Sequence, residues 1–266
     1  MTPVKSALGV AISMTASCIV NAGEALPGLA ASSSAGRPVS FVTCPEFRDT
    51  ARQCWLAENG GKVYYIGAIG FGTAPQLLHQ VLVEGTAHDD QASCGAINIS
   101  PVHLSVLPEI DTRCNTVLPD NGTHPRDPSR FDAPPEVLSQ IGAERPPPAP
   151  LTDDGHWSIA FDLDSAFLNQ LSQQTVESAA KASAVSSVAS VVIVGRSGAA
   201  RLDDGTTLGE DSQVANRRAK AVASAFKGLG VDPKLIEVRV DPQRIKGDGV
   251  HDWERRSVEI DVHLKR

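Results

Sequence analysis

The sequence predicts an α+β protein with two folded domains, an all-β domain followed by a βαβαββ domain. Short alternating apolar stretches joined by turn residues dominate residues 40–120, whereas strand and helix periods alternate from residue 156 to the end. A Pro-rich stretch at 121–155, with three consecutive prolines, separates the two regions and favours an extended spacer. The 266 residues, 41% hydrophobic and 5% aromatic, suit two modest cores better than one large core.

Residues 1–25 have the pattern of an export signal. One lysine precedes an apolar stretch from Ala7 to Val20, and small residues at Ala22 and Ala25 offer a cleavage site. The apolar stretch is shorter than the roughly 20 residues that a membrane-spanning helix needs, which makes a retained anchor the minority alternative.

A lipid anchor is the second alternative for this segment. Cys18, in the sequence TASC, would be acylated after cleavage of the signal. Residues 26–39 then form a linker of small residues. We therefore expect an exported protein of the periplasm or outer membrane, with membrane contact only through lipid at Cys18.

Four cysteines follow the signal, an even number that suits disulfides in an oxidising compartment. They are Cys44, Cys54, Cys94 and Cys114. The simplest pairing joins Cys44 to Cys54 and Cys94 to Cys114 because those loops are short, and the sequence leaves the other two pairings open. A zinc site is the rival interpretation. The chain lacks C-x-x-C and any spaced Cys/His set, so we expect no metal and no cofactor.

The domain at 40–120 is expected to be a small β structure. The segment CWLAENGGKVYYIG predicts two strands around an Asn-Gly-Gly turn, and HQVLVEG and INISPVHLSVLPEI alternate apolar and polar residues. A closed or half-closed barrel, of the oligonucleotide/oligosaccharide-binding (OB) type, would remove the strand edges.

The domain at 156–266 is expected to place two helices on one face of a sheet. The predicted elements, in order, are a strand in WSIAFDLDS, a helix over 166–188, a central strand in SVVIVG, a helix over 212–229 that begins near Asp211 and stops at Gly230, and strands in LIEVRV and RRSVEIDVHLK.

Four sequence motifs in this order resemble a known family. They are FDLDSA at 161–166, VVIVG, NRRAKAV at 216–222 and ERRSVEI at 254–260. Together they are similar to the OmpA-like domain, a periplasmic module that grips peptidoglycan, and the resemblance covers roughly residues 156–264. Nothing in residues 40–120 carries a comparable resemblance.

The resemblance implies a site for the diaminopimelate of the peptidoglycan stem peptide. An Arg of the second helix, which would bind the ligand carboxylate, corresponds to Arg218. An Asp after the second strand would bind the ammonium, but the family's Gly-His-Thr-Asp is GRSG here and Gly198 stands in place of the acid. Asp203 and Asp204 in the following loop are the substitutes that the sequence offers. Arg256, in the final motif, is expected to help order the pocket.

Helical geometry independently draws attention to Arg218. At 100° per residue it lies within the apolar sector of its helix, where a buried unpaired charge costs several kcal/mol. The guanidinium must therefore reach solvent, pair with an acid of its own chain or bind a ligand acid. The internal alternative is a pair with Glu259, Asp241 or another carboxylate.

These patterns predict a non-catalytic envelope protein that binds peptidoglycan. The alternative is a periplasmic interaction or scaffold protein that keeps the fold, has lost the ligand and docks other envelope proteins. A net charge of −7 argues against nucleic acid. The GRSGA segment lacks the final glycine of a nucleophile elbow, and the seven histidines form no H-E-x-x-H pair, so we expect no enzyme.

Overall fold

A computed structural model describes residues 36–50, 54–67, 73–123 and 150–266. The predicted signal, Cys18, nearly all of the 26–39 linker and most of the Pro-rich stretch lie outside the described residues. Below, "β-rich domain" refers to the described residues 36–123 and "C-terminal domain" to residues 150–266.

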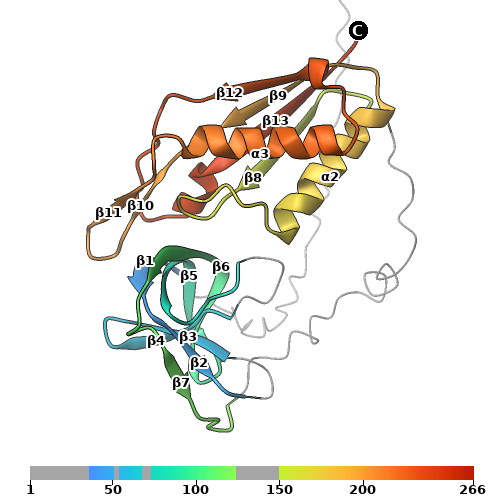
Figure 1. The fold of residues 1–266 in the computed structure, drawn as a ribbon. Helices are drawn as coiled ribbons and strands as arrows, with labels where there is room; N and C mark the ends of the chain where they lie inside the picture. Colours follow the sequence, from blue (N-terminus) through green and yellow to red (C-terminus); the bar gives the residue numbers. More distant parts are fainter. Residues whose placement is uncertain (1–35, 51–53, 68–72, 124–149) are drawn as a thin grey trace, which may run out of the picture. The chain divides into compact units, whose positions relative to one another are not determined.

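The β-rich domain is one seven-stranded sheet (Figure 1) with the order β1-β5-β6-β4-β3-β2-β7. Two of the six pairings, β6 with β4 and β2 with β7, are parallel, and the other four are antiparallel. Its strands are β1 Arg37–Thr43, β2 Pro45–Arg48, β3 Cys54–Asn59, β4 Lys62–Tyr65, β5 His79–Ser93, β6 Ala96–Ile110 and β7 Thr116–Leu118.

The predicted Asn-Gly-Gly hairpin is present as β3 and β4. Asn59 pairs with Lys62, so Gly60 and Gly61 form a two-residue turn. Both glycines have positive φ, +59° and +74°, which residues with a Cβ adopt at a cost. Two positive φ values give the turn the twist that an antiparallel hairpin requires.

The long strands β5 and β6 supply half of the buried residues of the larger core cluster. Val81 and Val83 of β5 and Leu104 of β6 are buried there together with Phe41 and Tyr64. The edge strands of the sheet are β1 and β7, and no pairing joins them within the described residues. A closed OB-type barrel is therefore not confirmed.

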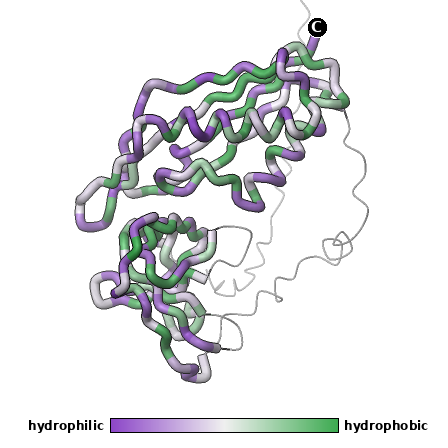
Figure 2. The backbone as a smooth tube through the Cα atoms, viewed as in Figure 1, coloured by the Kyte–Doolittle hydropathy of each residue, from purple (hydrophilic) through white to green (hydrophobic). Residues whose placement is uncertain are grey.

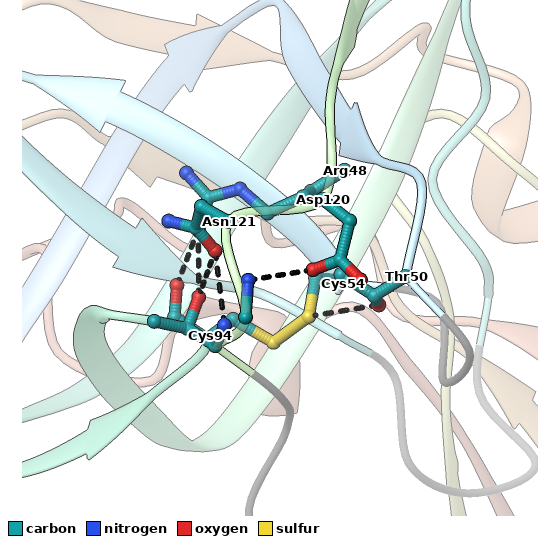
Figure 3. Close-up of a disulfide and its surroundings, with 8 residues drawn as sticks. Arg48, Thr50, Cys54, Cys94, Asp120 and Asn121 are labelled. Atoms are coloured by element: carbon teal, nitrogen blue, oxygen red, sulfur yellow. Dashed lines mark hydrogen bonds between the residues drawn. A yellow bond between two sulfur atoms is a disulfide. The ribbon is translucent and has the colours of Figure 1, made fainter.

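The disulfides join Cys44 to Cys114 and Cys54 to Cys94, so the short-loop pairing was wrong. Figure 3 shows the Cys54–Cys94 bond. Pro45 pairs with Ala57 at one end of the β2–β3 hairpin, which places the preceding Cys44 far from Cys54 at the other end. Cys94 and Cys114 flank the two ends of the 15-residue strand β6, so they do not meet.

The C-terminal domain is a four-stranded sheet with the order β12-β9-β13-β8, and its two helices lie on one face (Figure 1). Strand β12 runs parallel to β9, whereas β13 is antiparallel to both β9 and β8. The sequence of elements is β8 Gly155–Ala160, α2 Gln170–Val185, β9 Val188–Gly195, β10 Ala199–Arg201, β11 Thr207–Gly209, α3 Val214–Gly228, β12 Ile236–Val240 and β13 Ser257–Leu264, with short 3-10 turns at Pro233–Leu235 and at Asp252–Arg255 (η3).

Two features of this domain differ from the sequence prediction. The hairpin β10–β11 is inserted between β9 and α3, where a loop was expected. Helix α2 begins four residues later than predicted, because the side chain of Asn169 accepts a hydrogen bond from the Ser172 N–H and caps the helix there.

Helix α3 lies close against strand β9. A Cβ added to Gly195 would come within 2.1 Å of the Ala215 carbonyl oxygen, so only glycine allows this approach. Hydrophobic residues follow the central strands of the sheet (Figure 2), and Ile193, Ile260, Val222 and Phe226 are fully buried between sheet and helix. This packing fixes the start of α3 beside the loop that follows β9.

Among the described residues, the helices are too short or too polar to span a bilayer.

Peptide mapping tests the disulfide connectivity. Non-reducing digestion is expected to release peptides linked through Cys44–Cys114 and Cys54–Cys94. Because Cys44 and Cys114 are 70 residues apart, replacing both by Ala should lower the free energy of unfolding by about 4 kcal/mol. A Cys44–Cys54 peptide would contradict this fold.

His156 provides a pH-dependent test of the β8–β13 pairing. Its Nδ1 donates to Asp261 at 2.7 Å, and this bond is the largest cause that raises the pKa of His156 above its ordinary value. A raised folded-state pKa stabilises the fold fully below the unfolded pKa of about 6.5 and loses its effect as pH rises through the folded value. A His156→Gln variant should unfold at lower denaturant than wild type at about pH 5.5 and match it at about pH 9. An equal difference at both pH values would contradict this.

Candidate functional site

Arg218 lies in the second turn of α3, on the face that packs against the sheet. The buried residues of the helix include Val214, Val222 and Phe226, which with Arg218 follow a four-residue spacing, whereas Leu229, just after the helix, is 42% exposed. Arg218 itself has no exposed surface. The prediction that it lies on the buried face is confirmed.

All five N–H groups of the Arg218 guanidinium are used within the chain. Nε donates to the Ser165 carbonyl at 2.7 Å, and Nη1 donates to the Arg196 carbonyl at 3.1 Å. Nη2 donates to the Asp162 carbonyl at 2.8 Å. The remaining two N–H groups bind both carboxylate oxygens of Glu210, Nη1 to Oε2 at 2.9 Å and Nη2 to Oε1. Since a guanidinium has five donors, none is left for a further acceptor.

Glu210 is equally saturated. Besides the two bonds from Arg218, Oε1 accepts from the Asp164 N–H and Oε2 accepts from the Gly198 N–H, both at 2.9 Å. The Glu210 side chain has no exposed surface. Two charged and two backbone donors thus surround one carboxylate, which satisfies its lone pairs and offsets the cost of removing the charge from water.

The site joins segments that are distant in the sequence. The loop after β8 supplies Asp162, Asp164 and Ser165, the loop after β9 supplies Gly198, and the residues before α3 supply Glu210. The guanidinium also lies over the Phe161 ring, 5.2 Å from its centroid. The arrangement is a receptor for one carboxylate, and a carboxylate of the chain fills it.

This structure differs from the expectation that Arg218 presents its fork to an external acid. The internal pair, the alternative that the sequence left open, is what the chain forms. Neither acid named for that pair is the partner: Glu259 lies beside Arg196 and His156, and Asp241 beside Arg196.

Gly198 lies at the edge of the site, where its N–H binds Glu210. A Cβ at this position would lie 3.2 Å from Cγ of Arg256 and 3.4 Å from Cβ of Arg255. A side chain here would require Cγ of Arg256 to shift by a few tenths of an ångström, whereas the contact with Arg255 is an ordinary one. No acid stands at this position, and its backbone N–H binds Glu210 instead.

Asp203 and Asp204 do not reach Arg218. Asp204 accepts from the N–H and the hydroxyl of Thr206, both at 2.8 Å, and the backbone bond is the largest cause that lowers the pKa of Asp204. Asp203 accepts from the Ser40 N–H at 3.0 Å and from Asn59 at 3.3 Å, both in the β-rich domain. Both acids belong to the β10–β11 hairpin, not to the carboxylate receptor.

Arg256 is buried rather than exposed at its strand end. Its Nη1 binds Oε1 of Glu84 at 3.1 Å and its Nη2 binds Oε2, and neither side chain is more than 2% exposed. Its contact with the site is indirect, through the packing of its stem against Gly198.

The arrangement has no group free for catalysis. Every polar atom of the receptor is bound, and neither a nucleophile nor a base faces Arg218 in the described contacts. The described residues contain one group of three potential metal ligands, Cys44, Asp111 and Cys114, and two of these form a disulfide. We find no donor set for a metal within that part of the chain.

Glu210 is the functional residue that sequence reasoning missed. It lies eight residues before Arg218, outside the helix, so helical spacing does not pair the two. The buried arginine itself is the available signal. When no ligand supplies a carboxylate, Arg218 needs one from its own chain, and two acids, Glu210 and Asp211, come shortly before the helix.

No protein-family profile matches the chain, and no curated protein matches it. Solved structures are similar to part of it. The OmpA-like domain of FopA1 from Francisella tularensis is 22% identical with a TM-score of 0.31, over 44% of this chain and 81% of that one. The periplasmic domain of Helicobacter pylori MotB (residues 97–256) is 16% identical with a TM-score of 0.31, over 44% and 86%. The cell wall anchor of the T6SS from Pseudomonas aeruginosa is 17% identical with a TM-score of 0.31, over 43% and 85%. At these identities and scores, the function has to be inferred from the residues of the chain itself.

The Arg218–Glu210 pair is expected to be essential for stability. Arg218→Ala leaves a buried unpaired carboxylate and should lower the free energy of unfolding by about 3 to 5 kcal/mol. Arg218→Met combined with Glu210→Gln should recover part of this loss, because no charge is left buried. Chemical denaturation measures both.

Arg217 is the matched control, since its side chain is 44% exposed and pairs with Asp211 at the surface. Arg217→Ala should cost less than about 1 kcal/mol. Equal losses in the free energy of unfolding for the two arginine variants would show that the buried pair stabilises the fold no more than the exposed Arg217–Asp211 pair.

Proposed function

We propose that this chain is a non-catalytic, exported cell-envelope protein whose C-terminal domain serves as a protein-docking module. In this proposal the Arg218 site takes no peptidoglycan acid, because Glu210 already fills it. The observation that carries the proposal is the complete saturation of both side chains, five donors on Arg218 and four donors to Glu210.

An external carboxylate would have to displace Glu210 before it could bind. Glu210 would then lose two charge-assisted bonds and two backbone bonds, each charge-assisted bond contributing about 1.5 to 3 kcal/mol. A ligand that offers the same four bonds gains nothing over Glu210 and also loses its freedom of motion on binding. A weak affinity follows from this competition.

The other residues assigned to the ligand by resemblance also support protein docking. Asp203 and Arg256 both bind groups of the β-rich domain, Ser40 and Glu84 respectively. The C-terminal domain therefore contacts protein at Asp203 and at Arg256. The resemblance implies contact with peptidoglycan at the first position and support of the pocket at the second.

Export is supported by the two disulfides of the β-rich domain. Such bonds form and persist in oxidising compartments, of which the bacterial periplasm is one. This agrees with the signal-like pattern at residues 1–25 and with a location in the periplasm or at the outer membrane.

Peptidoglycan binding is the second candidate function, and the geometry of the receptor favours it. Two guanidinium donors and two backbone N–H groups around one carboxylate are the contacts that a diaminopimelate carboxylate would require. For this function Glu210 would have to move out of the site.

Sedimentation with purified, insoluble sacculi separates the two candidates. The mature protein is incubated with sacculi and centrifuged, and the pellet is compared with and without free meso-diaminopimelate. Docking to protein predicts that the chain stays in the supernatant. A pellet that free diaminopimelate abolishes would overturn the proposal and establish the second candidate.

Arg218→Lys and Arg217→Ala are the variants for the same assay, each first checked for native circular dichroism. If the second candidate holds, Arg218→Lys should lose the pellet, since Lys lacks the bidentate fork, and Arg217→Ala should keep it. A wild-type pellet that neither diaminopimelate nor Arg218→Lys reduces would also overturn the docking proposal, because it would show wall binding through another surface.

A further inference from the structure

The β-rich domain and the C-terminal domain have separate hydrophobic cores, one around Val81, Val83 and Phe41 and one around Ile193 and Phe226. The described residues nevertheless belong to one compact unit. What joins the two domains must therefore be found outside the cores, among the polar contacts that cross between them.

The central contact is the pair of Glu84, on β5, with Arg256, just before β13. The two side chains meet through two parallel bonds, and neither is more than 2% exposed. Glu84 belongs to the sheet of the β-rich domain, where a buried carboxylate needs a charged partner. Arg256 of the C-terminal domain is that partner.

A second contact joins the β10–β11 hairpin to strand β1. The Asp203 N–H donates to the Ser40 carbonyl at 2.7 Å, and the Ser40 N–H donates to the Asp203 carboxylate at 3.0 Å. Asn59 adds a bond to the same carboxylate at 3.3 Å. Asp203 thus satisfies backbone groups on an edge strand that would otherwise need water or another strand.

A third contact involves residues 162–165, which lie between the β-rich domain and the Arg218 site. On one side, an oxygen of the Asp162 carboxylate lies 3.2 Å from Nε2 of His103, and the Leu163 N–H donates to the Ser105 hydroxyl at 2.8 Å. On the other side, the same segment supplies two carbonyls to Arg218 and the Asp164 N–H to Glu210. The segment that borders the carboxylate receptor is therefore also held by the β-rich domain.

From these contacts we infer that the β-rich domain is the fitted binding partner of the C-terminal domain within the same chain, and that its docking keeps the Arg218 site closed. The statement that docking keeps the Arg218 site closed (the closure clause) rests on the proposed function, in which Glu210 fills the site. The statement that the two domains dock (the docking clause) does not, because the Glu84–Arg256 and Asp203–Ser40 contacts lie outside the receptor.

The buried charge pair gives this docking its specificity. Any other apposition of the two surfaces would bury Glu84 or Arg256 without its partner, which is costly. A bidentate Arg–carboxylate pair also fixes orientation, because the two planar groups match in one geometry. The pair therefore selects one arrangement of the domains rather than a loose association.

Cleavage of the connection tests the docking clause. A protease recognition sequence is inserted between residues 133 and 148, and the folded full chain is cut. Both disulfides lie within residues 44–114, so no covalent bond then joins the halves. The two fragments are expected to elute together in size-exclusion chromatography and to separate only on a denaturing gel.

The double variant Glu84→Gln/Arg256→Met removes both charges together, so neither is left unpaired. Its cleaved fragments should bind each other with a dissociation constant at least about tenfold larger than wild type. Glu237→Gln/Arg239→Met is the matched control. That pair is also bidentate but is more than half exposed on edge strand β12, and its loss should leave co-elution unchanged.

Hydrogen exchange tests the closure clause. The Asp164 and Gly198 N–H groups both donate to Glu210, and in the uncut double variant they should exchange faster than in wild type, while Ile193 in the core keeps its protection. Unchanged exchange at both amides in a variant whose fragments separate would overturn closure by docking.

Separate elution of the wild-type fragments, each with native circular dichroism and intact disulfides, would overturn the docking clause. That result is independent of the proposed function, which fails instead if the uncut chain sediments with sacculi in a manner that diaminopimelate abolishes. The two failures are thus distinguishable.

Discussion

The carboxylate of Glu210 is the group on which the loops after β8 and β9 of the C-terminal domain depend. It neutralises Arg218, which lies on the face of α3 that packs against the sheet, and it accepts hydrogen bonds from the backbone N–H groups of Asp164 and Gly198. Two loops that are far apart in the sequence and helix α3 converge on this one group. Without it, each of the three would leave a buried donor without an acceptor, so the local fold and the charge balance of α3 are a single constraint.

The same interaction explains why a resemblance in sequence does not carry a ligand with it. Arg218 is retained in the position that the resemblance assigns to ligand recognition, and its environment is still that of a carboxylate receptor. The difference lies in the source of the carboxylate. In place of a ligand acid, Glu210 from the loop before α3 supplies the carboxylate, and Gly198 donates its N–H to the same group.

The sequence predicted the secondary structure better than the contacts between distant segments. Alternation and helical period located β3, β4, β9, β13 and α3 because those signals are local. Two local rules failed where tertiary structure decides. The shortest loops do not pair the cysteines, because Cys94 and Cys114 lie at opposite ends of β6. The partner of Arg218 was not found, because it lies in a loop whose path no spacing rule gives.

All four cysteines of the disulfides lie in the β-rich domain, and the chain has no cysteine after residue 114. The covalent crosslinks thus stabilise one half of the polypeptide and leave the other half to noncovalent packing. Maturation of the two halves therefore has different chemical requirements: the C-terminal sheet can form in any redox environment, whereas its companion is completed only after thiol oxidation. Completion of the whole molecule therefore depends on the oxidation of four thiols.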